Sequence, residues 1–284
     1  MKILVCGGDA RQLYAAKALR EDGFDIFYAL TEGESDDIPS FSEKIRAADA
    51  ALLPLPVFRA GFLNAPASSL RLDIGAAAAL LRDARVVIGG ILPPALTQSP
   101  EVRAVAFCDY YRDADFTLKN AELTAEGVLG LLIAHTPRAV RGASYLITGY
   151  GASGKAIARL LKTVGASVTV AARKKEARES ARADGCAAIP FDALVSAAPQ
   201  FDAVINTVPA RVIGADALGA LPSDALLLEI SSAPFGIDFE AAAQKNLRVI
   251  KAPGIPGRVA ADSAGRIIAA CAEKYLNKKE NPYE

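Results

Sequence analysis

The sequence has few of the residues from which metal centres and disulfide frameworks are built. Its 284 residues include one histidine and four cysteines, which lie far apart at Cys6, Cys108, Cys186 and Cys271. Without C-x-x-C or histidine spacing, neither a zinc site nor disulfide bonds are expected, and no metal is predicted. The thiols are expected to be buried in a reducing cytoplasm.

Long apolar runs and an excess of charge are also missing. The longest apolar helical segment, residues 128–134, is far too short to span a membrane. The first residues, MKILVCGGD, lack the long apolar region and cleavage site of a signal peptide, so a first strand is predicted there. With 32 basic and 32 acidic residues, a nucleic-acid-binding protein is not expected, and 52% apolar content fits an ordinary soluble cytoplasmic protein of about two domains.

What the sequence does contain is a glycine turn between two apolar runs. Residues 145–148 and 167–172 are predicted strands, with a helix over residues 155–164 between them. The turn is a full G-x-G-x-x-G, in which the glycines allow a tight turn, close approach of a pyrophosphate and helix–strand packing. The helix N-terminus offers free N–H groups to phosphate. The predicted phosphate-binding residues are Gly149, Gly151, Ala152, Ser153 and Gly154.

The same glycines also fit the phosphate loop of nucleoside triphosphatases. That motif, G-x-x-x-x-G-K, requires Ser or Thr after the lysine to hold Mg²⁺. This chain has Ala156 in that position. The dinucleotide interpretation is therefore favoured.

The end of the second strand indicates which dinucleotide binds. NAD sites usually place Asp or Glu there for the ribose 2′-OH, whereas this strand ends in Arg173, Lys174 and Lys175. Arg and Lys suit a 2′-phosphate. The alternative is that these cations open a solvated helix, since Glu176 and Glu179 follow. NADP is favoured, with NAD possible.

Strand and helix patterns alternate along the chain and predict an α/β fold. We expect two Rossmann-like domains with parallel sheets flanking a cleft, joined by a long interdomain helix. Residues 31–42 are expected to be a loop and residues 102–107 a strand element. The predicted parts are a substrate domain (1–116), the helix (117–136), a dinucleotide domain (137–262), a last helix packing on the first domain (263–276) and a frayed tail (277–284).

The first domain is predicted to begin with a second, incomplete glycine turn. Gly7-Gly8-Asp9-Ala10-Arg11-Gln12 has no third glycine, and Asp9 would repel a pyrophosphate. A substrate-side loop is therefore expected, with Arg11 and Gln12 as ligands of the substrate. Leu53-Pro54-Leu55-Pro56 ends another strand where ligands bind in open sheets. It is either a rigid loop or a substrate contact through Pro56.

The polar start of the long helix carries the catalytic candidates. Lys119, Asn120 and Glu126 are expected to face the cleft, with Asn120 also anchoring substrate and Glu122 or Glu126 available as a base. The alternative for Thr117 and Asn120 is helix capping. His135, at the other end of the helix, is expected to cap its C-terminus, where a cation is favourable near the negative end of the helix dipole. The alternative is a catalytic role.

Loops after the later strands supply the remaining candidates. Asn206-Thr207-Val208-Pro209 follows the fourth strand of the second domain, where Thr207, Val208 and Pro209 are expected on the nicotinamide side of the cofactor. Ser231 follows the next strand and is also a predicted cofactor residue. Residues 252–260 contain two prolines and two glycines, which predict an irregular loop with Arg258 available for an anion.

The chain resembles the family of dipicolinate synthase A subunits over nearly its whole length. The resemblance is carried by both glycine turns, by Leu53-Pro54-Leu55-Pro56, by residues 120–127 (NAELTAEG) and by residues 252–260 (APGIPGRVA). More loosely, the layout is similar to 2-hydroxyacid, alanine and shikimate dehydrogenases. No His–Glu pair follows the cofactor domain, so the acid–base dyad of the hydroxyacid dehydrogenases is not expected.

The resemblance implies an activity, a partner and a location. The activity is NADP-linked oxidation and dehydration of a 4-hydroxy-tetrahydrodipicolinate-type precursor to dipicolinate, so the substrate is a small dicarboxylate. The partner is the B subunit of dipicolinate synthase, a smaller flavoprotein-like chain, in a homodimer or hetero-oligomer. The location is the cytoplasm of the mother cell of a sporulating bacterium. The alternatives are an NADP-dependent dehydrogenase of another small carboxylated substrate, such as shikimate or an amino acid, and a non-catalytic nucleotide-binding subunit.

Overall fold

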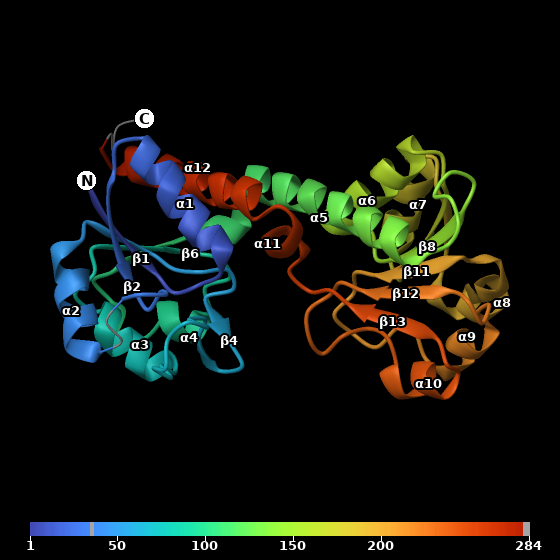
Figure 1. The fold of residues 1–284 in the computed structure, drawn as a ribbon, viewed down its shortest axis with the longest axis horizontal. Coiled ribbons are helices and arrows are strands. Elements are labelled where there is room, and N and C mark those ends of the chain that lie inside the picture. Colours follow the sequence, from blue (N-terminus) through green and yellow to red (C-terminus); the bar gives the residue numbers. More distant parts are fainter. Residues whose placement is uncertain (35–36, 281–284) are drawn as a thin grey trace. The chain divides into compact units, whose positions relative to one another are not determined.

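The chain folds into two compact α/β units. A computed structural model describes residues 1–34 and 37–280. One unit contains Met1–Lys119 together with Ala260–Glu284, and the other contains Asn120–Val259. Each unit has its own parallel sheet with helices against it (Figure 1).

The sheet of the first unit has five parallel strands in the order β2-β1-β3-β6-β7. The strands are apolar and largely buried, as expected for a sheet covered on both faces. The order reverses between β1 and β3, and in open α/β sheets ligands bind outside the carboxyl ends at such a switch point. The strands are β1 (Lys2–Cys6), β2 (Asp25–Ala29), β3 (Ala50–Leu52), β6 (Val86–Gly89) and β7 (Ala106–Asp109).

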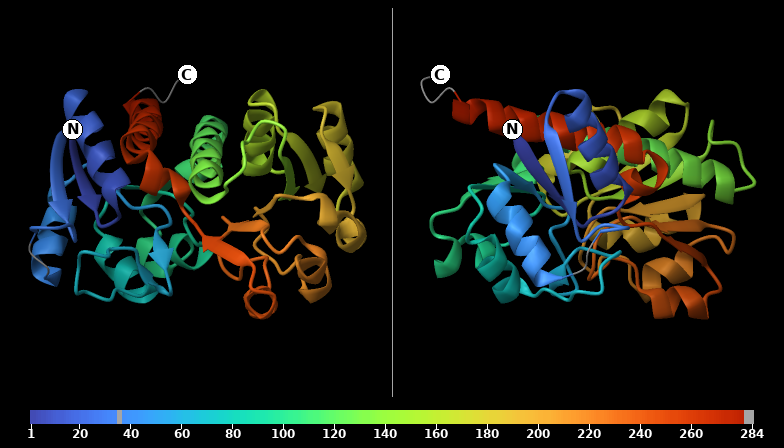
Figure 2. Two further views of the ribbon diagram at one scale, coloured as in Figure 1. Left: turned by 45° about the vertical axis from the view of Figure 1, so that its right-hand side comes forward. Right: turned by 60° about the vertical axis from the view of Figure 1, so that its left-hand side comes forward.

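The last helix of the chain packs on the first. Helix α12 (Ala261–Glu280) lies alongside α1 (Ala10–Glu21) in all three views (Figures 1 and 2). The two backbones approach closely at Gly265, where a Cβ atom would lie 2.7 Å from the Arg11 carbonyl oxygen. The other elements of this unit are α2 (Ile38–Ala47), α3 (Ile74–Leu81), α4 (Pro94–Thr97), two 3-10 turns (Pro100–Val102 and Tyr110–Arg112) and the hairpin β4 (Phe58–Arg59) and β5 (Phe62–Leu63).

The sheet of the second unit has six parallel strands in the order β10-β9-β8-β11-β12-β13. Numbered within this sheet, the order is the 3-2-1-4-5-6 of dinucleotide-binding domains, with the switch point between β8 and β11. The strands are β8 (Ser144–Thr148), β9 (Ser167–Ala171), β10 (Ala187–Ile189), β11 (Ala203–Asn206), β12 (Leu226–Glu229) and β13 (Arg248–Lys251).

A long helix, α5 (Ala114–His135), runs from the first unit into the second. It packs on α11 (Ile255–Val259) at Gly127, where a Cβ atom would lie 2.1 Å from an Ile255 methyl group. Only glycine fits this contact. The other helices of this unit are α6 (Ala152–Thr163), α7 (Lys175–Ala183), α8 (Leu194–Ala197), α9 (Ala215–Ala220) and α10 (Phe239–Gln244), with 3-10 turns at Phe191–Ala193 and Ala198–Gln200.

The prediction of two parallel sheets and a long helix is confirmed, but three local predictions are wrong. Residues 38–42 are helical rather than looped, because the Asp37 carboxylate caps α2 by accepting from the Ser40 N–H at 2.7 Å. Residues 102–107 are a 3-10 turn followed by the start of β7, not one strand element. Residues 252–260 are not wholly irregular, because α11 forms within them.

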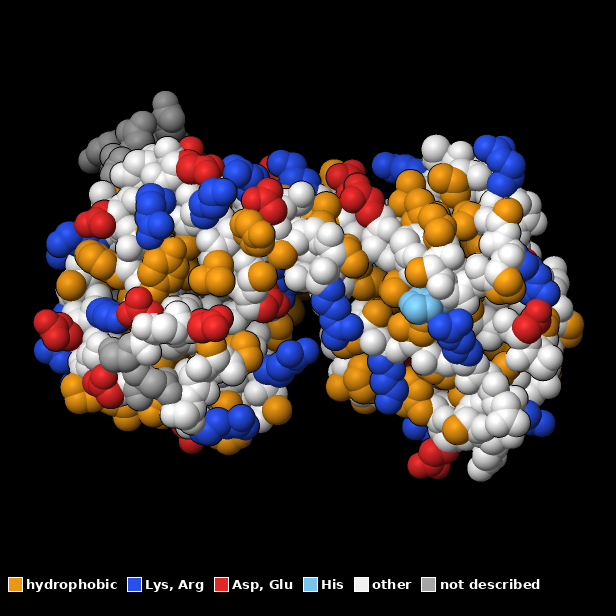
Figure 3. Space-filling view, in the orientation of Figure 1, with side chains coloured by type: hydrophobic (Ala, Val, Ile, Leu, Met, Phe, Trp, Pro, Cys, Tyr) orange, Lys and Arg blue, Asp and Glu red, His pale blue; other side chains and the backbone are white. Residues whose placement is uncertain are grey.

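Two helix ends also differ from the prediction. Neither Thr117 nor Asn120 caps α5; the Asp113 carboxylate does, accepting from the N–H groups of Asp115 and Phe116 at 2.9 and 3.1 Å. The expected tail is helical through Glu280, and residues 281–284 lie outside the described residues. In the described part of the chain, no helix combines the length and apolarity needed to cross a membrane. Basic and acidic side chains are interspersed over the face of the first unit seen in Figure 3.

Candidate active site

The glycine turn of the second unit has the geometry that a dinucleotide requires. Gly149 has φ +86°, a left-handed conformation that favours glycine. A Cβ atom on Gly154 would lie 2.4 Å from the Gly149 carbonyl oxygen, so this glycine lets α6 pack against β8. Around Gly151, in contrast, a Cβ atom would meet nothing within 4 Å. The turn is therefore sterically crowded at Gly149 and Gly154, whereas there is free space beside Gly151.

The helix that follows begins directly at the turn. Helix α6 starts at Ala152, with Gly151 as its N-cap, three residues earlier than the sequence predicted. Gly151 has no side chain with which to cap the first N–H groups, so these groups face the turn without a side-chain partner. Ala152 and Ser153 therefore lie in the first turn of an uncapped helix, which is where an anion is stabilised.

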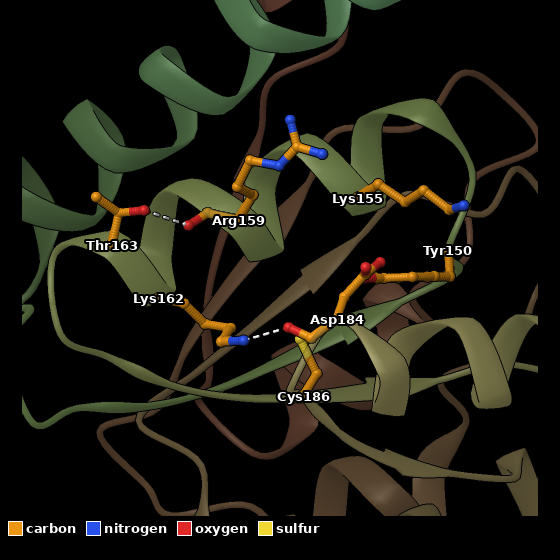
Figure 4. A pocket seen from close by; sticks show the side chains of 7 residues that line it. All are labelled: Tyr150, Lys155, Arg159, Lys162, Thr163, Asp184 and Cys186. Atoms are coloured by element: carbon orange, nitrogen blue, oxygen red, sulfur yellow. Dashed lines mark hydrogen bonds between the residues drawn. The ribbon is translucent and has the colours of Figure 1, made fainter.

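The side chain of Tyr150, the second residue of the turn, is anchored away from the glycines. Its ring is buried, and its hydroxyl donates to the Asp184 carboxylate at 2.8 Å. Burial, and then Asp184, raise the pKa of this hydroxyl. Together with Cys186 these residues line one wall of a cavity of about 340 Å³, while Lys155, Arg159, Lys162 and Thr163 of α6 line the other (Figure 4). The Tyr150 side chain thus points into the gap beside α6 and leaves the glycine backbone clear.

The strand end that selects the dinucleotide carries no carboxylate. Arg173 and Lys174 follow β9 with exposed side chains, and neither side chain makes a hydrogen bond or ion pair with any described residue. Lys175 differs from them, because it pairs with Glu179 on α7 at 3.6 Å. The loop itself is held by Arg178, which donates to the carbonyl oxygens of Ala172 and Arg173 at 2.8 and 2.7 Å.

The predicted nicotinamide-side residues lie on the loop after β11, and the predicted cofactor residue Ser231 lies on the loop after β12. The Thr207 hydroxyl donates to the Thr148 carbonyl oxygen at 2.7 Å, and the Val208 N–H donates to the Asn206 side chain at 3.1 Å. Pro209 is exposed. Ser231 is buried, and its hydroxyl donates to the Glu229 carboxylate at 2.7 Å. These residues are brought together by a buried polar cluster that the sequence reasoning did not single out.

That cluster consists of Thr148, Asn206 and Glu229, the last residues of β8, β11 and β12. The three lie side by side in the sheet register, and all are fully buried. The sequence did contain a signal for it, since Glu229 ends the apolar run Leu226-Leu227-Leu228. A carboxylate is rarely buried at the end of such a run without a reason.

In the first unit, the predicted substrate residues Arg11, Gln12 and Pro56 meet at the carboxyl ends of β1 and β3. Arg11 is buried and donates to Asp9 through Nε and Nη2 at 2.9 and 2.8 Å, and through Nη2 to the Leu55 carbonyl oxygen at 2.7 Å. Gln12 donates to the Leu52 carbonyl oxygen at 3.0 Å. The loop that contains Pro56 is thus tied to the start of α1.

Asp9 has a different role from the one that the sequence indicated. Its carboxylate caps α1 and forms a bidentate pair with Arg11. Burial would raise the pKa of Asp9, but the hydrogen bonds and charge of Arg11 outweigh it and keep the pKa below its ordinary value. Two buried polar atoms near this loop, Gln12 Oε1 and the Tyr110 hydroxyl oxygen, have no hydrogen-bond partner among the described residues.

The remaining candidates lie on helices. On α5, Lys119 and Glu126 are exposed and share one helix face by spacing, while Asn120 is half-buried. Arg258 is exposed on α11, in the second unit. His135 accepts from Arg248, the first residue of β13, at 2.7 Å, so it lies at the amino edge of the sheet, opposite the glycine turn. No group of His, Cys, Asp and Glu that could hold a metal occurs among the described residues.

Comparison with known proteins agrees with this geometry. Residues 2–111 match the family model of the N-terminal domain of the dipicolinate synthase A subunit, and residues 130–240 match that of the D-isomer specific 2-hydroxyacid dehydrogenase NAD binding domain. The A subunit of dipicolinate synthase from Bacillus subtilis (strain 168) is 29% identical over 97% of this chain and 96% of its own length. The chain is a homologue of the dipicolinate synthase A subunit.

Two crystal structures of dipicolinate synthase A subunits are similar to this chain in three dimensions as well. The crystal structure of the dipicolinate synthase A subunit from Bacillus halodurans has a TM-score of 0.82 at 27% identity and covers 97% of both chains. The Bacillus subtilis structure has the same TM-score and identity, covering 99% of this chain and 97% of the other. The resemblance to dipicolinate synthase inferred from the loop motifs is therefore confirmed, and the second unit is an NAD(P)-binding domain by its match and fold.

Proposed function

We propose that this chain is an NADP-linked oxidoreductase that forms dipicolinate. The overall reaction converts a 4-hydroxy-tetrahydrodipicolinate-type precursor and NADP⁺ into dipicolinate, water, NADPH and one proton. The observation that carries the proposal is the likeness to the dipicolinate synthase A subunit over 97% of the chain. By the same likeness, the B subunit is the proposed partner and the mother cell of a sporulating bacterium the proposed location.

The cofactor half of the proposal is supported by the fit of the second unit to a dinucleotide. Gly151 and the uncapped start of α6 would hold the pyrophosphate, and Arg173 with Lys174 would hold a 2′-phosphate. NADP⁺, when bound, supplies the hydride acceptor. The protein contributes the fixed position of the nicotinamide on the loops after β11 and β12.

The substrate half of the proposal is supported by the first unit. A dicarboxylate requires cations or N–H donors, and Arg11 is held rigidly at the switch point of the first sheet. Its bidentate pair with Asp9 leaves Nη1 as the edge available to a substrate carboxylate. Aromatisation of the ring makes the oxidation strongly downhill, so a strong base is not required; Glu126 on α5 is the proposed proton acceptor, with Lys119 and Asn120 beside it.

The test is to incubate the purified chain with precursor and NADP⁺, with and without the B subunit. We expect the ultraviolet band of dipicolinate and the absorbance of NADPH to rise together, in equal amounts. If NADP⁺ binds but neither band rises in either mixture, the chain binds the nucleotide without catalysing the reaction. Shikimate and amino acids are tested in parallel mixtures in place of the precursor. If NADPH forms only with one of these, the substrate assignment is wrong.

A further inference from the structure

The carboxyl edge of the second sheet contains a line of buried polar side chains across its switch point. Thr148, Asn206 and Glu229 are paired in register on β8, β11 and β12 and are each 0% exposed. The Thr148 hydroxyl donates to the Asn206 carbonyl oxygen, and the Asn206 amide donates to Glu229 Oε1 at 2.7 Å. Burying three adjacent polar groups is costly unless each is fully hydrogen-bonded, and here each is.

Glu229 is the centre of this line. Its Oε1 accepts from the Asn206 amide, from the Ser231 N–H at 3.0 Å and from the Ser231 hydroxyl at 2.7 Å. Its Oε2 accepts from the N–H groups of Gly236 and Ile237 at 2.8 and 3.1 Å. Five donors thus surround one carboxylate, and no cation of the described residues pairs with it. All of the hydrogen-bond partners that the structure gives this carboxylate are neutral N–H and O–H donors, which hold it in a fixed orientation.

The five hydrogen bonds fix the shape of the loop after β12. Phe235 has φ +64°, a left-handed conformation that is unfavourable for a residue with a side chain. The next two N–H groups, of Gly236 and Ile237, are those held by Glu229 Oε2. A Cβ atom on Gly236 would lie 2.4 Å from the Asn206 amide nitrogen, so the loop is pressed onto the cluster. The exposed tip, residues 232–234, is therefore held by a buried anchor.

Asn206 fixes the loop after β11 in the same way. Its amide nitrogen donates to the Val208 carbonyl oxygen at 2.9 Å, and its carbonyl oxygen accepts from the Val208 N–H at 3.1 Å. The loops after β11 and β12 are therefore both held by hydrogen bonds to one connected pair of buried side chains, Asn206 and Glu229. In a domain of this strand order, the side of the switch point where these loops lie receives the second nucleotide half of the cofactor.

We infer that Glu229, through Asn206 and Ser231, is a positioning residue that sets the two loops receiving the nicotinamide half of the dinucleotide. The inference rests on the proposed function. Because Glu229 is fully buried, it acts through the loops and touches no ligand. Without Glu229, the nicotinamide half should therefore lose its fixed position. The adenosine half, which is proposed to bind around Gly151 and Arg173, should be unaffected.

The substitution Glu229→Gln tests this inference sharply. Whichever way the new amide turns, its NH₂ group faces two or three of the existing donors, so one loop is released. The probes are NADPH, which carries both halves, and adenosine 2′,5′-bisphosphate, which carries only the adenosine half. We expect the preference for NADPH over the bisphosphate to fall about tenfold, with bisphosphate affinity unchanged. The emission of bound NADPH should also shift toward that of the free nucleotide.

A matched control separates this effect from a general loss of stability. Asp202 lies at the amino edge of the same sheet, where its carboxylate accepts from the Ser144 N–H at 2.8 Å and pairs with Arg138 at 3.1 Å. Asp202→Asn should lower the melting temperature without changing the preference. Ser231→Ala removes one of the five donors and serves as the milder variant if Glu229→Gln does not fold. It should lower the preference by a smaller factor.

The outcomes distinguish the inference from the proposed function. If Glu229→Gln and Ser231→Ala weaken both probes equally, the cluster is only structural and the inference is wrong, while the proposed function stands. An unchanged NADPH emission spectrum in both variants would overturn the inference in the same way. If the unmodified chain binds neither NADPH nor NADH, the proposed function fails, and the inference fails with it.

Discussion

At the scale of single residues, Arg173 is the sharpest test of cofactor choice. Its guanidinium is exposed at the end of β9 and has no partner among the described side chains, so it is available to a 2′-phosphate. Arg173→Ala should weaken NADP⁺ about tenfold, as expected for loss of a charge-assisted hydrogen bond, and leave NAD⁺ nearly unchanged. Titration calorimetry with both nucleotides measures this difference.

Lys175 provides the control at the same scale. It changes the charge of the chain by the same amount when replaced by alanine, but its ammonium group is already paired with Glu179. Lys175→Ala should therefore affect both nucleotides little. An equal loss of NADP⁺ and NAD⁺ affinity in Arg173→Ala would mean that the cations only begin a solvated helix, which is the alternative left open by the sequence.

Individual residues also show how far the sequence could lead. The place of the glycines in the turn and of the cations after β9 was predictable, because both are set by local sequence; their roles in cofactor binding stay predictions. The roles of Glu229 and Asp9 were not predictable. Glu229 depends on partners that are distant in the chain, and Asp9 depends on the direction of its side chain. The sequence suggested that Asp9 would repel a pyrophosphate, whereas in the structure its charge is paired with that of Arg11, two residues away. Whether Lys119, Asn120 and Glu126 act in catalysis stays a prediction.

At the scale of elements, two glycines of the turn into α6 have different predicted roles: Gly154 allows the helix to pack, and Gly151 leaves space for the pyrophosphate. Gly154→Ala would place a methyl group 2.4 Å from the Gly149 carbonyl oxygen, which is backbone and cannot easily move. We expect this variant to lose about 1–3 kcal/mol of unfolding free energy and to bind both dinucleotides weakly. Chemical denaturation and nucleotide titration measure the two effects.

Gly151→Ala should behave differently, although it lies three residues away. Gly151 has φ −80° and open space around its Cβ position, so alanine fits the fold. The methyl group would instead occupy the space predicted for the pyrophosphate. We expect unfolding to be nearly unchanged and dinucleotide binding to be lost. Should Gly151→Ala bind NADP⁺ normally, the pyrophosphate does not lie on this turn.

Elements with strong periodicity were predictable, whereas short ones were not. The strands and helices around the glycine turn have clear apolar patterns and were found within a few residues. Helix α11 forms in a segment with two prolines and two glycines because Ile255 packs against Gly127 of α5, a contact that no local pattern reveals. The start of α2 depended on the Asp37 cap, which an acidic, turn-rich composition concealed.

At the scale of the whole molecule, the end of the chain returns to its beginning, and a carboxylate lies in that contact. Glu273 on α12 has a buried carboxyl oxygen, Oε1, without a hydrogen-bond partner among the described residues. Its carboxyl group also interacts with Asp22, the C-cap residue of α1. Burial, and then Asp22, raise the pKa of Glu273 to about 7. Because this pKa exceeds that of the unfolded chain, the folded state binds the proton more tightly. The resulting stability is present below the unfolded pKa and is lost as pH rises through the folded value.

The last prediction concerns this loss of stability with rising pH. The melting temperature should fall between about pH 5 and about pH 8 in the unmodified chain, and the fall should be smaller in Glu273→Gln, whose side chain stays neutral. Glu21 is the control, because it joins the same two helices through Arg266 at 3.1 Å but is exposed. Glu21→Gln should lower stability at neutral pH and leave the fall in place. Identical pH profiles for Glu273→Gln and the unmodified chain would show that burial and Asp22 do not raise the pKa of Glu273 in this contact.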